Sequence, residues 1–137
     1  MKKRGDWEQR FCSFIEEART KDFKWGTWDC CIFSDSAIQA MTGESLIPKA
    51  LKWNNEEEAK VAIKSYGGST LLRAMMKATK AKKVKQVDVR HISRGDLVVF
   101  KEESQLVGMC VGFNIIAPTD DGLAFKENTL AIKAWRI

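Results

Sequence analysis

The sequence predicts an α+β fold in which N-terminal helices pack on a C-terminal antiparallel β-sheet. Up to Lys80, apolar residues recur at helical spacing. Beyond Lys80 the period changes, and short β-branched or apolar runs alternate with polar turns. Helices followed by strands are the order typical of α+β domains. The length of 137 residues and the 45% hydrophobic content suit one domain over residues 1–137 with one core.

Four helices are expected in the first part of the chain. The first covers 7–18, where the apolar residues fall on one face: Trp7, Phe11, Phe14, Ile15 and Ala18. The second covers 30–41, with Asp29 as its N-cap and Gly43 just past its end. An irregular linker is expected over 44–54, with its Trp53 in the core. The third helix is expected to start after Asn55, which forms a capping box with Glu58, and to end at Gly67-Gly68. The fourth is a short helix that begins at Leu71 and is capped by Ser69 or Thr70.

Strands are expected from the apolar runs that follow. These runs are Val84 to Val89, Leu97 to Phe100, Leu106 to Phe113, Ile115-Ile116 and Leu130 to Ile137. The clearest turn is Thr119-Asp120-Asp121-Gly122, which has the composition of a tight connection between strands. The sequence therefore predicts an antiparallel sheet that packs on the helices.

Cys30 is the candidate nucleophile. If Asp29 caps the second helix, Cys30 occupies the first helical position, where amide donors and the helix dipole favour a thiolate. The alternative is a small buried apolar residue, which most free cysteines are. Cys12 is expected to fill the core, and Cys31 to pack sideways.

Several short motifs resemble, in order and spacing, the NlpC-type papain-like cysteine peptidases. They are Trp25-Gly26 with Asp29-Cys30, then Gly95 to Phe100, then Val107 to Gly112. With the closing Ala134-Trp135-Arg136-Ile137, the chain is more narrowly similar to a short branch carried in tail-gene modules of siphophages and gene transfer agents. The resemblance implies a papain-like, NlpC-type version of the α+β fold.

Carried over residue by residue, the resemblance implies a degenerate catalytic triad. Cys30 matches the nucleophile, but Leu106 stands at the histidine position and Ile116 at the third polar position. Neither side chain can accept a proton or orient an imidazole, and losing a triad member typically costs several powers of ten in rate. Trp25, Asp29 and Cys110 are the candidates for lining the pocket; Cys110 shares a strand face with Leu106.

Other polar partners for Cys30 are few. His91 is the only histidine, and we expect it to be exposed or locally bonded in a loop. Asp29, Asp96 and Gln105 remain conceivable, although Asp96 belongs to a turn and is expected to fix its backbone. With four cysteines that lack metal-ligand spacing and one histidine, neither a metal nor another cofactor is expected. The thiols are expected to be reduced in a cytoplasm.

Composition argues against nucleic acid and membrane partners. The formal charge is +5, but the lysines of 77–85 have no interleaved aromatic residues on which bases would stack. The longest uncharged run, 104–119, is too short and too polar to span a bilayer, and the N-terminus does not have the pattern of a secretory signal.

The resemblance implies a place in a virion tail, assembled in the host cytoplasm. We expect a catalytically degenerate module of the tail tip that contacts hub, distal-tail or tape-measure proteins. The alternative is a virion-associated peptidoglycan hydrolase, a cysteine amidase or endopeptidase using Cys30. A third possibility is an assembly factor absent from the finished particle. If the domain is a component of a tail ring, its interface should hold exposed aromatic or Arg anchors, for which Trp7, Trp53 and Trp135 are candidates.

Overall fold

The structure, a computed structural model, describes all residues 1–137 and confirms the α+β class. Its α-helices are α1 (Trp7–Ala18), α2 (Cys30–Thr42), α3 (Glu56–Gly67) and α4 (Leu71–Ala81). Its strands are β1 (Lys85–Val87), β2 (Leu97–Lys101), β3 (Gln105–Cys110), β4 (Asn114–Thr119), β5 (Gly122–Glu127) and β6 (Ala131–Arg136). Two short 3-10 helices are η1 (Val89–His91) and η2 (Asn128–Leu130). None of the helices combines the length and the apolar character needed to cross a bilayer.

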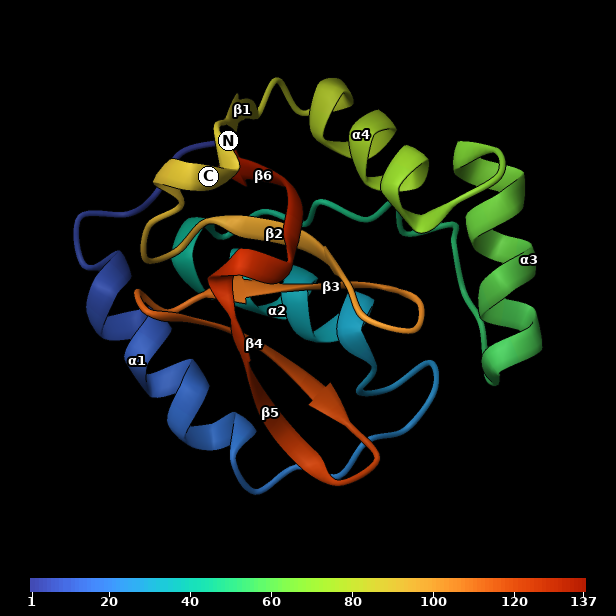
Figure 1. Cartoon of the computed structure of the whole chain (residues 1–137), viewed down its shortest axis with the longest axis horizontal. Helices are drawn as coiled ribbons and strands as arrows, with labels where there is room; N and C mark the ends of the chain where they lie inside the picture. Colours follow the sequence, from blue (N-terminus) through green and yellow to red (C-terminus); the bar gives the residue numbers. More distant parts are fainter.

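The six strands form one sheet in the order β1-β6-β2-β3-β4-β5, and all neighbours are antiparallel (Figure 1). Strand β5 was not expected. Its sequence, Gly-Leu-Ala-Phe-Lys-Glu, starts with glycine and ends in two charges, and it has no β-branched residue. It is a strand because the tight turn after β4 brings it back into register with that strand.

The helix ends follow from local sequence, as predicted. Asp29 caps α2, Asn55 caps α3 and Thr70 caps α4, each accepting a hydrogen bond from a backbone amide of the first turn. Gly43 ends α2 in the left-handed region, with φ of 82°, which is costly for any residue with a Cβ. These caps fix where each helix begins, and that of α2 places Cys30 at its first position.

Helix α2 lies at the centre of the molecule, between α1 and the sheet. It packs on β3 and β4 on one side and on α1 on the other, while α3 and α4 pair at the side of the sheet (Figure 1). Phe11 of α1, Phe33 of α2 and Met109 of β3 are completely buried. The first four of the five residues of β2, Leu97 to Phe100, are buried as well, so both faces of this strand are covered. The start of α2 is therefore held by packing on two sides.

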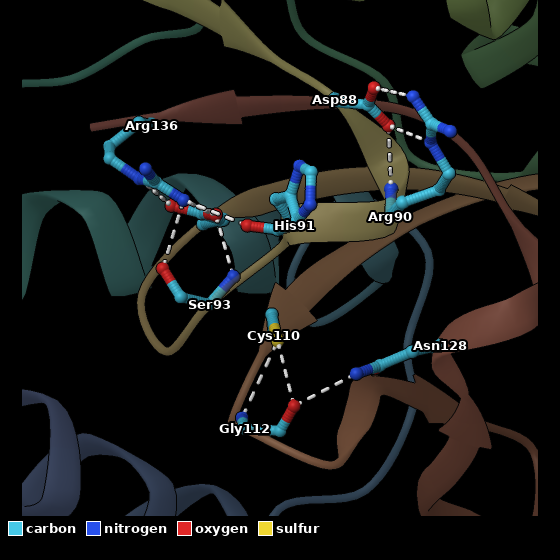
Figure 2. A network of polar contacts seen from close by, with 9 residues as sticks. Asp88, Arg90, His91, Ser93, Cys110, Gly112, Asn128 and Arg136 are labelled. Atoms are coloured by element: carbon cyan, nitrogen blue, oxygen red, sulfur yellow. Dashed lines mark hydrogen bonds and ion pairs between the residues drawn. The ribbon is translucent and has the colours of Figure 1, made fainter.

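The turn before β2 is tied to the last strand by an ion pair. The carboxylate of Asp96 is fully buried and accepts hydrogen bonds from the backbone amide of Ser93 at 2.8 Å and from Arg136 at 2.9 and 3.1 Å (Figure 2). The carboxylate raises the pKa of the Arg136 guanidinium. Asp96 thus fixes the turn backbone, as expected, and Arg136 extends this role to β6.

Candidate functional site

A cleft of about 570 Å³ opens at the start of α2. Its walls come from the turn before α2, the 44–54 linker, α3, the start of α4 and the β2–β3 hairpin. Among its lining residues are Trp25, Asp29, Cys30, Trp53, Gln105 and Leu106. All six were named from the sequence, and the structure brings four of the predicted catalytic or pocket residues together here: Trp25, Asp29, Cys30 and Leu106.

Cys30 lies on the wall of this cleft and is about nine-tenths buried. The pKa of Cys30 is lowered chiefly by the neighbouring Cys31 thiol and to a smaller extent by the backbone amide of Val107 on β3, against the opposing effect of burial. The pKa of Cys31 is raised well above its ordinary value by the same contact with Cys30 and by burial. Of the two thiols, Cys30 therefore loses its proton more easily.

Asp29 is next to Cys30 but is committed to structural hydrogen bonds. Its carboxylate is almost completely buried and accepts from the amide of Gly26 at 2.9 Å, the amide of Ile32 at 3.0 Å and the indole Nε1 of Trp53 at 2.6 Å. These three donors belong to the turn, the helix and the linker, respectively. Asp29 thus joins three segments of the cleft wall, and its oxygens are occupied.

The linker between α2 and α3 has little regular structure but is held at both ends. Near its start, the carboxylate of Asp35 accepts from the hydroxyl of Ser45 at 2.6 Å and from the amides of Leu46 and Ile47 at 2.6 and 3.2 Å. Near its end, Trp53 is anchored to Asp29. Trp53 is buried in the core, as predicted, and one part of it also lines the cleft.

The side of the cleft formed by β3 offers Cys30 no acid or base. Leu106 is half-buried there, and the side-chain oxygen of Gln105 accepts from the amide of Leu72 at the start of α4, at 2.9 Å. Gln105 therefore fixes α4 to the hairpin. No histidine lines the cleft.

The other ionisable residues of the cleft come from α3 and were not predicted as site residues. Glu56, Lys60 and Lys64 line the wall, and Lys60 lies 3.6 Å from Glu56. Their spacing of four residues places them on one helix face. This spacing is the signal by which they could have been found.

Three residues considered from the sequence lie outside the cleft. His91 is exposed on η1, where its carbonyl oxygen accepts from Arg136 (Figure 2). Ile116 is completely buried in β4. Cys110, expected as a pocket-lining residue, does not line the cleft.

The position of Cys110 follows from strand geometry. Cys110 and Leu106 share a face of β3, but they are four residues apart, which is about 13 Å along a strand. The Cys110 sulfur instead faces the backbone of Gly112, with the amide nitrogen at 3.4 Å (Figure 2). Burial raises the pKa of this thiol. No three His, Cys, Asp or Glu side chains are grouped as metal ligands would be.

Comparisons with known proteins correct the family assignment. No curated protein matches the chain. The family model that matches, over residues 2–137, is described as a domain of unknown function, DUF6950, and no NlpC or peptidase family is found. The peptidase resemblance was wrong: its motifs are short turn and strand signals, and the two positions that would carry the chemistry hold Leu106 and Ile116. The chain belongs to the DUF6950 family.

Proposed function

We propose that this protein is a non-catalytic binding module whose cleft receives an extended segment of a partner protein. One observation carries the proposal: the cleft wall around Cys30, formed by Asp29, Gln105 and Leu106, offers it no free base, and the other carboxylate of the cleft, Glu56, is paired with Lys60 on α3. Asp29 is saturated by three donors, Gln105 is bonded to α4, and Leu106 is apolar.

A stabilised thiolate does not replace the missing group. In amide hydrolysis by a cysteine nucleophile, a proton must be delivered to the leaving amine, and a general acid or base typically contributes 10²- to 10⁴-fold. Cys31 keeps its proton but is buried beside Cys30, within the same helical turn. The arrangement therefore favours binding over turnover.

The walls of the cleft differ in character. Trp25, Trp53 and Leu106 form an apolar side, and the polar side is the face of α3 that carries Lys60 and Lys64. The volume of about 570 Å³ is within the range of small-ligand and peptide side-chain pockets. We infer an occupant that presents an apolar side chain to the indoles and a carboxylate to the lysines.

For the fold, we propose a papain-like arrangement, without membership of the peptidase family. Its support is a cysteine that begins the helix packed on an antiparallel strand, here Cys30 on α2 against β3. The expected setting, a phage tail with hub, distal-tail or tape-measure partners, remains a proposal that rests on the sequence pattern alone. Detection in purified particles would support it and would oppose a transient assembly factor.

The binding proposal is tested with a displayed library of random peptides. The library is selected on the folded protein and counter-selected on Leu106→Arg, which fills the cleft with a charged side chain. The matched control is Val61→Arg, at an exposed position of α3 that does not line the cleft. We expect peptides that bind the wild type and Val61→Arg but not Leu106→Arg. Peptides that bind all three proteins equally would refute binding in the cleft.

A second candidate is a cysteine hydrolase acting on peptidoglycan, favoured by the lowered pKa of Cys30. Its test is the release of muropeptides from purified sacculi by the wild type and by Cys30→Ala. The binding proposal predicts no release by either protein. Release by the wild type that disappears in Cys30→Ala would replace it with the hydrolase.

A further inference from the structure

The two edges of the sheet differ. The β1 edge has only three residues and is flanked by lysines, Lys82 and Lys83, while Lys85 lies within it. Short, lysine-rich edges are how proteins prevent strand pairing between molecules. The β5 edge is twice as long, and its exposed aromatic residue, Phe125, is 53% accessible. Phe113 is the most exposed large apolar residue, at 95%. It lies immediately before Asn114, the first residue of β4, which pairs with Glu127 of β5. The β5 edge therefore has less of this protection, since its one lysine, Lys126, is paired with Glu102 at 2.8 Å.

The register shows which backbone groups of β5 point outward. Pro118 of β4, which has no N–H, lies opposite Leu123, so this pair is not the hydrogen-bonded kind. The carbonyl oxygens of Gly122 and Lys126 accept from Thr119 and Asn114 side chains, respectively, at 2.8 and 3.3 Å, and thus face β4.

Because antiparallel positions alternate, the remaining residues direct their N–H and C=O groups away from the sheet. These residues are Leu123, Phe125 and Glu127. The backbone groups of Leu123 and Phe125 make no bond to a loop or to a side chain, whereas the carbonyl of Glu127, the N-cap of η2, belongs to the first turn of that 3-10 helix. A row of free donors and acceptors thus runs beside an exposed phenyl ring.

We propose that β5 pairs with β5 of a second copy of this chain, antiparallel about a twofold axis at Phe125. In this register Phe125 faces Phe125, and Leu123 faces Glu127 on each side of the axis. Phe125 then exchanges both backbone hydrogen bonds with its twin, and on each side the N–H of Glu127 donates to the carbonyl of Leu123 in the other copy. Aromatic pairs across antiparallel strands add to the stability of the ladder.

Charge selects this register over its neighbours. A shift of the twofold axis by one residue along β5 still pairs the outward residues with one another, so backbone hydrogen bonding alone does not choose the register. An axis at Ala124 would place Asp121 opposite Glu127, and an axis at Lys126 would place two lysines opposite each other. Like charges directly across a ladder are destabilising. With the axis at Phe125, Lys126 faces Ala124 and no like charges meet.

The first test is the mass of the full-length protein by sedimentation velocity across concentrations from about 1 to about 300 μM. We expect a reversible dimer. Phe125→Arg places two cations across the axis and should weaken the dimer about tenfold or more. Phe125→Pro removes the phenyl ring and an outward N–H but no bond to β4, so it should abolish the dimer. Val61→Arg, on α3, is the matched surface control and should dimerise normally.

The second test fixes the register by oxidative cross-linking in a Cys12→Ser background, because Cys12 is the exposed native thiol. Across a hydrogen-bonded pair the Cα atoms are about 5.5 Å apart, within reach of a disulfide. Phe125→Cys should therefore form a covalent dimer. Lys126→Cys should not, because position 126 faces position 124 of the other copy and lies two residues away from the other position 126. A monomer at every concentration, a dimer unaffected by Phe125→Arg, or stronger cross-linking at position 126 would each overturn the proposal. Circular dichroism confirms that each variant is folded before it is scored.

Discussion

Replacing Asp29 with alanine should cost a large part of the stability of this protein. Three buried or half-buried donors lose their acceptor together: the amides of Gly26 and Ile32 and the indole of Trp53. Loss of an N-cap costs about 1 kcal/mol, and a buried donor left unpaired costs about 1–3 kcal/mol. With the turn amide included, the expected loss is about 3–5 kcal/mol in the free energy of unfolding.

The assay is urea unfolding followed by circular dichroism, with Trp53→Phe and the double variant completing a thermodynamic cycle. Trp53→Phe removes the indole donor, so the two changes should be less than additive by about 1–2 kcal/mol. The matched control is Asp6→Ala, since Asp6 precedes α1 without making a side-chain cap bond, and it should change stability little. A loss below about 1 kcal/mol for Asp29→Ala, or strict additivity with Trp53→Phe, would refute the assigned role.

Gly26→Ala should lower the free energy of unfolding by about 2–4 kcal/mol, because φ is +78° there and a Cβ would overlap a backbone oxygen of the linker; a thermal shift of less than about 3 °C would contradict this. Arg136→Ala leaves the buried carboxylate of Asp96 without its cation and should cost about 1–2 kcal/mol, a range discounted because the guanidinium is partly exposed. In an Asp96→Asn background, Arg136→Ala should lower the free energy of unfolding by less than it does in the wild type. An equal loss in both backgrounds would exclude the pairing of Arg136 with Asp96. Alkylation of Cys30, followed by peptide mass spectrometry, should have a midpoint pH below that of the denatured chain, because the fold stabilises the thiolate. Cys31→Ala removes the neighbouring thiol and should raise that midpoint, and an unchanged midpoint would show that Cys31 does not lower the pKa of Cys30.

The parts of the fold that were predicted are those that local sequence controls. The helix starts at Asp29, Asn55 and Thr70, and the end of α2 at Gly43, depend on hydrogen bonds and backbone angles within a few residues. Strand β5 was missed because its pairing is imposed by its neighbour and its own composition is ambiguous. Local signals therefore predicted the elements but not the complete sheet.

The candidate site was predicted in part for the same reason. The start of α2 identified Cys30, but the contact between Asp29 and Trp53 joins residues 24 positions apart and has no local signal. The bond between Gln105 and α4 depends equally on the tertiary arrangement. The aromatic residues predicted as interface anchors were Trp7, Trp53 and Trp135, whereas the strongly exposed ones are Phe113 and Phe125. Residue type alone does not distinguish a core aromatic side chain from a surface one.

The linker held by Asp29 and Asp35 couples the stability of the fold to the affinity of the cleft for an occupant, two properties that could otherwise vary independently. Its conformational entropy is lost when the chain folds, so an occupant of the cleft would meet a wall that is already ordered. The same carboxylates also determine how firmly α2 and the linker are held. Substitutions that loosen this wall should therefore weaken ligand affinity and resistance to unfolding together. Among members of this family, the two aspartates should then change less than other residues, even where the occupants of the cleft differ.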